Sequence, residues 1–308
     1  MNKLILSIAV AIFLEGCSDT SSILLQTMKT ESQPKELKIS TCIFSFKSST
    51  FKETFSSGSS MGVFVLPDQT GTTALHRCQY KNIRATAFRK TDHSLRWECE
   101  PDILLDEHPI RVYAYYPYRP TASRDTASIP LRISANARLT PDFRFGTLTR
   151  GHKPINRQSP VAVLCMNHAL AQLCFRLTLK NDSGVPRNLE SIQVGNCPGS
   201  TRFCQRGQLN IADGSISGFP ETPGATILSF RPAKKLEVKP AEHFHIRVIP
   251  LSEPLQKSEI EVIFRIDQQS YRYRFPVGTL WESGYEYAYY FSFDGRRIHL
   301  DKMIQLFN

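Results

Sequence analysis

The stretch VAVLCMNHALAQLCFRLTLK, Val161–Lys180, decides the predicted fold because it is the longest low-charge run after the N-terminus and lies near the middle of the chain. Apolar residues alternate along its first half, and the alternation resumes from Leu173 to Leu179 after Asn167-His168-Ala169. A period of two predicts two buried strands joined by a kink, or a strand, one helical turn and a strand. The polar, proline-containing passage before it, Thr149–Pro160, is typical of an inter-domain connection. The stretch is therefore predicted to mark the place where one β domain ends and a second begins.

Short alternating segments continue on both sides of this stretch. Asp213-Gly214, Asp267–Ser270 and Asp294-Gly295 are typical hairpin turns, and no amphipathic helix of convincing length is found. Short strands with frequent turns and almost no helix predict an all-β fold built of β-sandwiches. The expected strands are 37–46, 61–66, 80–88, 95–99, 110–116 and 129–133 before the stretch, and 189–194, 208–211, 227–230, 243–250, 259–266, 271–275, 285–293 and 298–306 after it.

The length of the chain favours two domains. Its 308 residues exceed what one hydrophobic core usually organises. We predict an N-terminal β-sandwich over residues 37–158 and a C-terminal one over 159–308, preceded by a flexible tether over 17–36 that is rich in Ser, Thr, Gln and Lys.

The net charge of +10 raises the question of a nucleic-acid partner. The 38 Lys and Arg residues never run longer than pairs such as Lys234-Lys235 and Arg296-Arg297. A solvated basic surface on alternating strands explains this spacing better than a phosphate-binding patch does, so no nucleic acid is expected as a partner.

The N-terminus predicts the compartment. A short positive region, Met1-Asn2-Lys3, is followed by the apolar segment Leu4–Leu14, whose length is typical of a signal peptide rather than a membrane span. The segment ends in Leu14-Glu15-Gly16-Cys17, which resembles a bacterial lipobox, although Glu15 replaces the usual small uncharged residue. We therefore predict a lipoprotein signal peptide over residues 1–16 and lipidation of Cys17. An ordinary secretory cleavage beside a chance cysteine is the alternative.

The other seven of the eight cysteines cannot all pair within one chain. Cys197 and Cys204 flank a Pro-Gly turn and could close a loop. Cys78 and Cys99 are predicted to lie about 20 Å apart along one hairpin, which is too far for a disulfide. The remaining thiols are best interpreted as small buried hydrophobic groups, and no CxxC spacing indicates zinc.

Residue patterns that carry catalysis are not found in the sequence. His243-Phe244-His245 places two imidazoles on one face of a strand, but a third metal ligand at readable spacing is absent. Ser49-Thr50-Phe51-Lys52 matches an SxxK motif, yet it lies in a loop and lacks the later partners. His168 lies beside apolar residues and is interpreted as a hydrogen-bonded core or edge histidine. We therefore expect no enzyme activity, no catalytic or metal site and no cofactor.

Several short motifs follow one another along nearly the whole mature chain. They are Met61-Gly62-Val63-Phe64, Tyr80-Lys81-Asn82 with Trp97, Val112–Tyr118 (VYAYYPY), Asn167–Leu173 (NHALAQL), Gly207–Ile211 with Gly214 and Ile216, and Gly284–Tyr287. In this order, behind a lipobox, they resemble the fimbrillin-like (Mfa-like) lipoproteins whose members build type V fimbriae in Bacteroidetes. The sequence departs from that family at Phe143–Gly146, where a more acidic segment is usual, and at the Phe307-Asn308 end, where a tryptophan is usual.

The resemblance implies two tandem Greek-key, transthyretin-like β-sandwiches, attachment to the outer membrane, exposure at the cell surface and polymerisation by strand exchange. A β-sandwich that lacks one strand offers an open groove, which a compatible extended segment can fill. Leu37–Phe46 is the candidate for removal, and Lys47 and Lys52 in the following loop are candidate cleavage sites for a trypsin-like protease. The candidate donor strand is Ile298–Leu306, with a break at Asp301-Lys302; its four apolar donor residues are Ile298, Leu300, Ile304 and Leu306. Both stretches could instead be permanent strands of their own domains.

The sequence therefore predicts a structural subunit or adhesin of type V fimbriae, made as a lipid-anchored precursor and assembled by proteolysis-triggered donor-strand exchange. Its expected partners are other fimbrial subunits, the outer membrane through the N-terminal lipid, and a host protein or glycan receptor. The alternative is an outer-membrane surface lipoprotein that binds glycans or host proteins and never polymerises.

Overall fold

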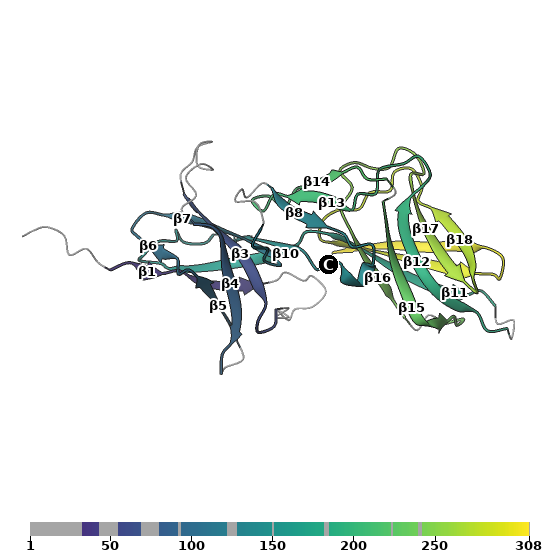
Figure 1. Cartoon of the computed structure of the whole chain (residues 1–308), viewed down its shortest axis with the longest axis horizontal. Helices are drawn as coiled ribbons and strands as arrows, with labels where there is room; N and C mark the ends of the chain where they lie inside the picture. The colour runs from purple at the N-terminus through teal and green to yellow at the C-terminus, as the bar shows by residue number, and fades with distance from the viewer. Residues whose placement is uncertain are drawn as a thin grey trace, which may run out of the picture. The chain divides into compact units, whose positions relative to one another are not determined.

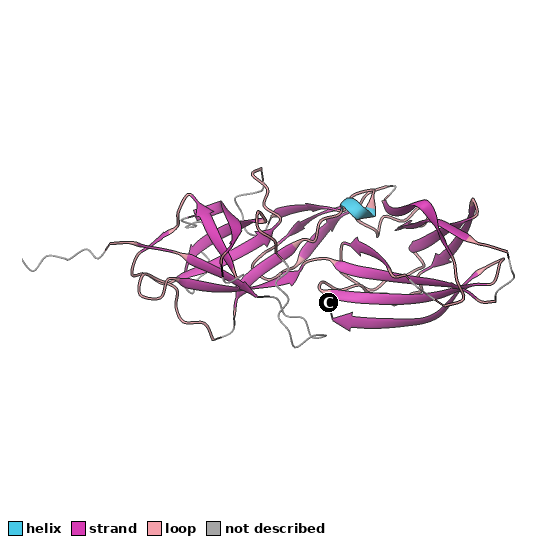
Figure 2. Cartoon of the chain, turned by 90° about the horizontal axis from the view of Figure 1, so that it is seen from below, coloured by secondary structure: helices cyan, strands magenta, loops and turns pink. Residues whose placement is uncertain are grey.

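A computed structural model describes residues 33–42, 55–68, 80–91, 94–121, 128–149, 151–181, 185–222, 224–239 and 242–307. Nearly all regular structure in this part of the chain is strand, as Figure 2 shows, and the all-β prediction is confirmed. The described residues also form a short 3-10 helix, Ala137–Leu139. None of the helical structure in these ranges is long and apolar enough to cross a membrane. The predicted lipidation site Cys17 and cleavage sites Lys47 and Lys52 lie outside the described residues.

The strands follow the predicted alternation closely, and most of their bounds agree with it to within a few residues (Figure 1). They are β1 (Lys35–Glu36), β2 (Lys38–Cys42), β3 (Ser60–Pro67), β4 (Tyr80–Arg89), β5 (Leu95–Glu100), β6 (Leu104–Leu105), β7 (Ile110–Tyr116), β8 (Ile129–Arg132), β9 (Arg144–Leu148), β10 (Val161–His168), β11 (Ala171–Leu179), β12 (Asn188–Asn196), β13 (Arg206–Leu209), β14 (Ile216–Phe219), β15 (Ala225–Lys235), β16 (Phe244–Val248), β17 (Ile260–Ile266), β18 (Gln269–Arg274), β19 (Tyr285–Phe293) and β20 (Ile298–Phe307).

Strands of the N-terminal half join in a closed barrel with the order β10-β2-β5-β4-β3-β7-β9. Residues that alternate along the strands fill its interior; Val63 and Val65 on β3, for example, are fully buried there. The residues between them face a different cluster, so that Phe64 and Leu66 pack on the outside of the barrel. β3 is therefore buried on both faces, which explains why its sequence, SMGVFVLP, is almost continuously apolar.

Strands of the C-terminal half form two four-stranded sheets, β16-β11-β19-β20 and β15-β12-β17-β18. Aromatic side chains from both sheets meet in one core, where the rings of Phe264 and Phe291 lie 5.0 Å apart and those of Phe175 and Phe264 lie 6.0 Å apart. Contact between the inner faces of two sheets defines a β-sandwich.

The change from barrel to sandwich occurs inside the central stretch. β10 pairs with β2 and β9 of the barrel, whereas β11 pairs with β16 and β19 of the sandwich. Ala169 and Leu170 join the two strands without a helical turn, so the kink is the correct one of the two alternatives. Strand pairing thus places the change from barrel to sandwich at these two residues, after β10.

A third, small sheet contains strands from both halves of the sequence, in the order β14-β13-β8. β8 precedes the central stretch, and it pairs with β13, which follows it. Beneath this sheet lies a separate apolar cluster that includes Tyr115 of β7 and Leu209 of β13. The two halves of the chain are thus joined by hydrogen-bonded strands as well as by the kink.

Four of the strands were not predicted: β1, β6, β9 and β14. The most important is β9, which closes the barrel by pairing with both β7 and β10. Its sequence, RFGTL, contains a glycine, which is depleted in strands, and an arginine, which is rarely buried. Arg144 is nevertheless buried because Asp142 accepts two hydrogen bonds from it, and Gly146 leaves the space that the Met166 side chain fills.

Candidate functional site

The first long strand, β2, is an integral part of the barrel wall. It runs parallel to β10, with register pairs from Val161↔Lys38 to Cys165↔Cys42. Its sequence alternates as predicted, because Leu37 and Ile39 are 2% and 4% exposed while Lys38 and Ser40 face solvent. Both apolar side chains belong to the barrel core. The predicted remainder of this strand, residues 43–46, lies outside the described residues.

The other edge of β2 is held more weakly. It meets β5 at a single register pair, Ile39↔Trp97, whereas its pairing with β10 extends over the whole strand. The Trp97 indole N–H also donates to Thr41 Oγ1 at 3.2 Å. A cavity of about 490 Å³ lies at this seam, lined by residues 36–40 of the first strands, by Lys90 and β5 residues 95–97, and by Val161. Few ladder hydrogen bonds would have to break for β2 to separate from β5.

Two thiols face each other across the β2–β10 pair. The Sγ atoms of Cys42 and Cys165 lie 3.2 Å apart, and both residues are free cysteines. Burial, together with the neighbouring Cys42 thiol, raises the pKa of Cys165, so the neutral thiol is favoured. The loop closure considered for Cys197 and Cys204 is not formed, because both are also free thiols.

The last strand, β20 (yellow in Figure 1), lies at the edge of the sheet β16-β11-β19-β20, and among the described residues it pairs only with β19. Ile298 pairs with Phe293 and Leu300 with Phe291, which places both on the core side of the sheet. The register then shifts, and Asp301 is left unpaired where its Oδ1 accepts a hydrogen bond from Ser292 Oγ at 2.9 Å. The predicted break at Asp301-Lys302 is thus a β-bulge.

The bulge moves the later donor residues to the opposite face. Ile304 pairs with Ala288 and Leu306 with Glu286, whereas Met303 pairs with the core residue Tyr289. Ile304 is 36% exposed, whereas Ile298 and Leu300 on the first half of β20 pack against the core. In this fold the four donor residues do not share a face.

β2 and β20 belong to different sheets of the same chain, and each is paired with its own neighbours. Within one copy, then, the first strand and the candidate donor are not brought together. A barrel without β2 would present unpaired backbone groups of β10 above an uncovered core.

His168 is placed as predicted, at a partly buried hydrogen-bonded position. Its Nδ1 lies 2.7 Å from Asp142 Oδ1, while Arg144 Nη2 lies 2.6 Å from Asp142 Oδ2. Burial alone would raise the pKa of the Asp142 carboxyl, but the His168 hydrogen bond and the charges of His168, Arg144 and Arg247 lower it to about 2. His168 is the last residue of β10, and Arg247 lies on β16. These ion pairs with Asp142 therefore lie beside the kink, where they have a structural role.

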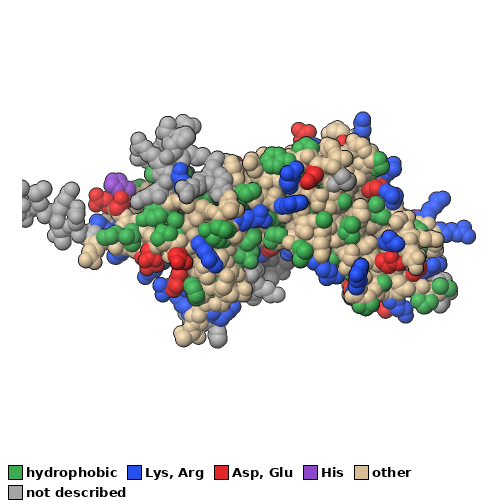
Figure 3. Space-filling view, viewed as in Figure 1, with side chains coloured by type: hydrophobic (Ala, Val, Ile, Leu, Met, Phe, Trp, Pro, Cys, Tyr) green, Lys and Arg blue, Asp and Glu red, His purple; other side chains and the backbone are tan. Residues whose placement is uncertain are grey.

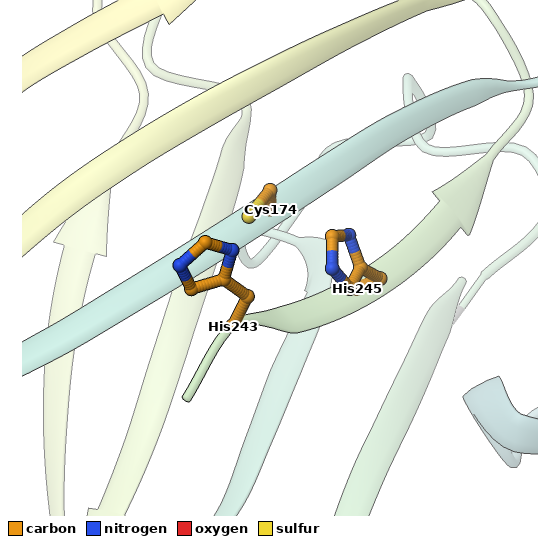
Figure 4. A group of neighbouring side chains, drawn as sticks. All are labelled: Cys174, His243 and His245. Atoms are coloured by element: carbon orange, nitrogen blue, oxygen red, sulfur yellow. The ribbon is translucent and has the colours of Figure 1, made fainter. Parts of the chain in front are cut away.

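The histidines of His243-Phe244-His245 lie together as the alternation predicts, but a third group that the sequence analysis missed lies between them. Cys174 on β11 is the register partner of His245 on β16. The three side chains form the group in Figure 4. Only strand pairing reveals this neighbour, because Cys174 and His243 are far apart in the sequence.

Basic side chains are spread over the face of the molecule in Figure 3 among acidic and apolar groups. Some basic side chains of the described residues form ion pairs: Arg265 Nε lies 2.9 Å from Glu190 Oε2, and Lys234 Nζ lies 2.9 Å from Glu242 Oε1. On this face, the positive charge therefore lacks the continuous patch that phosphate backbones require.

Solved structures with the same fold include proteins from several Bacteroides species. A protein assigned to cell adhesion from Bacteroides ovatus superimposes with a TM-score of 0.65 at 19% identity, covering 89% of this chain and 97% of its own. Another such protein, from Bacteroides uniformis, gives 0.61 at 13% identity, with 88% and 98% covered. A fimbrial protein from Bacteroides vulgatus gives 0.59 at 12% identity, with 87% and 99% covered. No curated protein sequence matches this chain.

The family itself is shown by the sequence match to a family model. The model described as fimbrillin-like matches residues 48–304, which is most of the chain. The matched span begins after β2 and ends within β20. All described barrel strands except β2, the kink and nearly all of the sandwich thus lie within the matched span, and the resemblance stated from the motifs is confirmed. The chain belongs to the fimbrillin-like family.

Proposed function

We propose that this protein is a lipid-anchored structural subunit or adhesin of type V fimbriae, assembled by donor-strand exchange after proteolysis. Its family and the fimbrial and cell adhesion proteins that share its fold support a structural role at the cell surface. In the finer proposal, the N-terminal barrel receives a strand from a neighbouring copy or a sister subunit, and the C-terminal sandwich donates one.

The single observation that carries the proposal is the way β2 is held in the barrel. Leu37 and Ile39 are almost completely buried in the barrel core, yet one edge of the strand is held by a single register pair. Loss of β2 would uncover the core positions that both side chains fill, together with the backbone of β10. Burial of each side chain contributes about 1.5–3 kcal/mol. An open groove of this kind can bind an extended segment by β-strand addition.

The proposed donor has the complementary pattern. Side chains alternate in a regular strand, so the four donor residues, all at even positions, would lie on one face if the bulge at Asp301 were absent. Lys302 would occupy the position between the two apolar pairs. Release of β20 would cost less than release of a central strand, because it lies at the sheet edge and pairs only with β19.

Cleavage would act on the connection between β2 and β3. The candidate sites Lys47 and Lys52 lie between Cys42, the last residue of β2, and Ser60, the first of β3. A cut there would leave β2 attached to the barrel only by non-covalent contacts. Lipidation of Cys17 would hold the uncut precursor at the outer membrane through the tether 17–36 until that cut releases it.

The proposal is tested by mixing cleaved and intact protein and separating the products on SDS gels without boiling. We expect a ladder of oligomers that withstands SDS at room temperature and collapses to monomer on boiling. A Lys47→Gln/Lys52→Gln double variant treated with the same protease should keep β2 and remain monomeric. Cleaved protein that has lost β2 and still gives one monomer band would reject strand exchange and leave the alternative of a non-polymerising lipoprotein that binds glycans or host proteins.

A matched pair of donor variants makes the test specific. Ile304→Asp places a charge at a position that is 36% exposed in the sandwich but would face the acceptor groove in a regular donor strand. Met303→Asp places the same charge at a position that is 49% exposed and would face outward in the donor. We expect Ile304→Asp to abolish the ladder and Met303→Asp to preserve it. Equal effects of the two variants would contradict the proposed register.

A further inference from the structure

Cys174, His243 and His245 form a cluster of metal-binding side chains on the sandwich. Their ligand atoms all lie within 4.8 Å of one another. Figure 4 shows the thiol of Cys174 directed toward the two imidazoles, which lie side by side at the start of β16: His243 directly precedes the strand and His245 lies on it. Cys174 is fully buried, whereas both histidines are exposed, so the cluster is accessible from solvent through the imidazoles.

The sheet geometry explains why these three residues meet. His243 and His245 are two residues apart, so their side chains lie on the same face, and Phe244 between them enters the sandwich core. Cys174 is the register partner of His245 on the neighbouring strand β11, while the adjacent Phe175 enters the core. The cluster therefore lies on the outer face of the sheet β16-β11-β19-β20. It joins the edge strand β16 to its neighbour.

We propose that Cys174, His243 and His245 bind a zinc ion, with water at the fourth coordination position. One thiolate and two imidazoles are ligands that zinc prefers, and three protein ligands with one open position are a common zinc arrangement. In a tetrahedral site with Zn–S and Zn–N distances near 2.3 and 2.1 Å, ligand atoms lie about 3.3–3.6 Å apart. Rotation of the two exposed imidazoles would close the remaining gap without a movement of the strands.

Neighbouring polar groups fit the role of orienting the ligands. Glu286 Oε2 lies 3.7 Å from His245 Nδ1, and it accepts a hydrogen bond at 2.7 Å from Gln172 Nε2, which itself lies 3.2 Å from His245 Nδ1. A carboxylate beside a metal-bound imidazole fixes its orientation and raises its basicity. Arg176 Nη2 lies 3.2 Å from His243 Nδ1, so a zinc ion at that nitrogen would replace the arginine as its partner.

Cobalt is the probe that distinguishes this site from adventitious binding to surface histidines. Tetrahedral Co²⁺ bound to a thiolate gives a sulfur-to-metal charge-transfer band and strong visible bands, and zinc displaces the cobalt. We expect the reduced protein to bind one equivalent of Co²⁺ with these bands. Binding should release the thiol proton, so the apparent affinity should increase with pH.

Variants assign the ligands. Cys174→Ala should abolish the charge-transfer band, and His243→Gln and His245→Gln should each weaken cobalt binding more than tenfold. The matched controls are Cys204→Ala and His108→Gln, which change a thiol and an imidazole elsewhere and should bind cobalt as the original protein does. Zinc should raise the melting temperature of the original protein and of the controls, but not that of the three ligand variants. The original protein binding cobalt without a charge-transfer band, or Cys174→Ala retaining that band, would overturn the proposal.

Discussion

Replacing Ile39 by alanine tests whether β2 seals the barrel. The Ile39 side chain is 4% exposed and belongs to the barrel core, beside Leu37, which is 2% exposed. Removing most of such a side chain loses its burial free energy and leaves a cavity, which together cost about 2–5 kcal/mol. We expect Ile39→Ala to lower the free energy of unfolding by an amount in this range, and Leu37→Ala to do the same.

Urea unfolding measures this loss when it is followed by tryptophan fluorescence, to which Trp97, the register partner of Ile39, contributes together with Trp281. Ser40→Ala is the matched control, because it truncates an exposed side chain of the same strand and should change the free energy of unfolding by less than about 0.5 kcal/mol. An Ile39→Ala protein as stable as the Ser40→Ala control would refute the conclusion that β2 completes the core.

Three further predictions concern charge, redox state and cooperativity. The folded-state pKa of Asp142 lies near 2, below its ordinary value of 3.8, so its ionised form stabilises the fold above about pH 4 and this contribution is lost as the pH falls through 2. Asp142→Asn should therefore cost roughly 2 kcal/mol at neutral pH, and the difference from the original protein should shrink between pH 4 and pH 2 in acid-denaturation curves; a pH-independent difference would contradict the role given to the charge. Oxidised glutathione should take two electrons and two protons from Cys42 and Cys165 to form one disulfide, which mass spectrometry detects as a loss of two hydrogen atoms. The cleaved, oxidised protein should then retain β2 until a reductant is added. Cys42→Ser should release β2 under both conditions. Because β8 pairs with β13 across the two halves, calorimetry should give one unfolding transition, and Leu131→Ala in the shared cluster should make two transitions appear; two transitions in the original protein would show that the halves unfold independently.

Much of this fold could be predicted because the apolar pattern of each strand reflects which of its faces are buried. β3 is almost continuously apolar and is buried on both faces. β19 is rich in aromatic residues and packs against the large core of the sandwich. In both strands the sequence pattern agrees with the position. The hairpin of β4 and β5 was also predicted, and Cys99 faces Ala85, one residue from the expected position 84.

The parts that could not be predicted depend on distant partners. β9 contains Arg144, which is buried beside the nearby Asp142 and opposite His168 of β10, a strand that follows later in the chain. The third member of the histidine cluster, Cys174, is brought in by the pairing of β11 with β16. The opposite faces of Leu300 and Ile304 result from a bulge in the pairing with β19, which no alternation in the sequence reveals.

The most direct test of strand exchange asks whether β20 of one copy lies beside β10 of another. Val163→Cys on β10, 39% exposed and next to Ser40 of β2, would label the acceptor, which is then cleaved to remove β2. Asp301→Cys, Met303→Cys and Gln305→Cys, three positions that would face outward in a regular donor strand, would label the donor, and Val277→Cys in an exposed turn is the control.

With the acceptor labelled by ¹⁵N, mass spectrometry identifies any disulfide that joins the two copies. The account predicts a mixed-isotope peptide in which the thiol introduced by Val163→Cys in the acceptor is linked to one of the three donor thiols, and none with the Val277→Cys control. If none of the three donor variants cross-links more than the control does after β2 has been lost, the claim that a neighbour's C-terminal strand replaces β2 is contradicted.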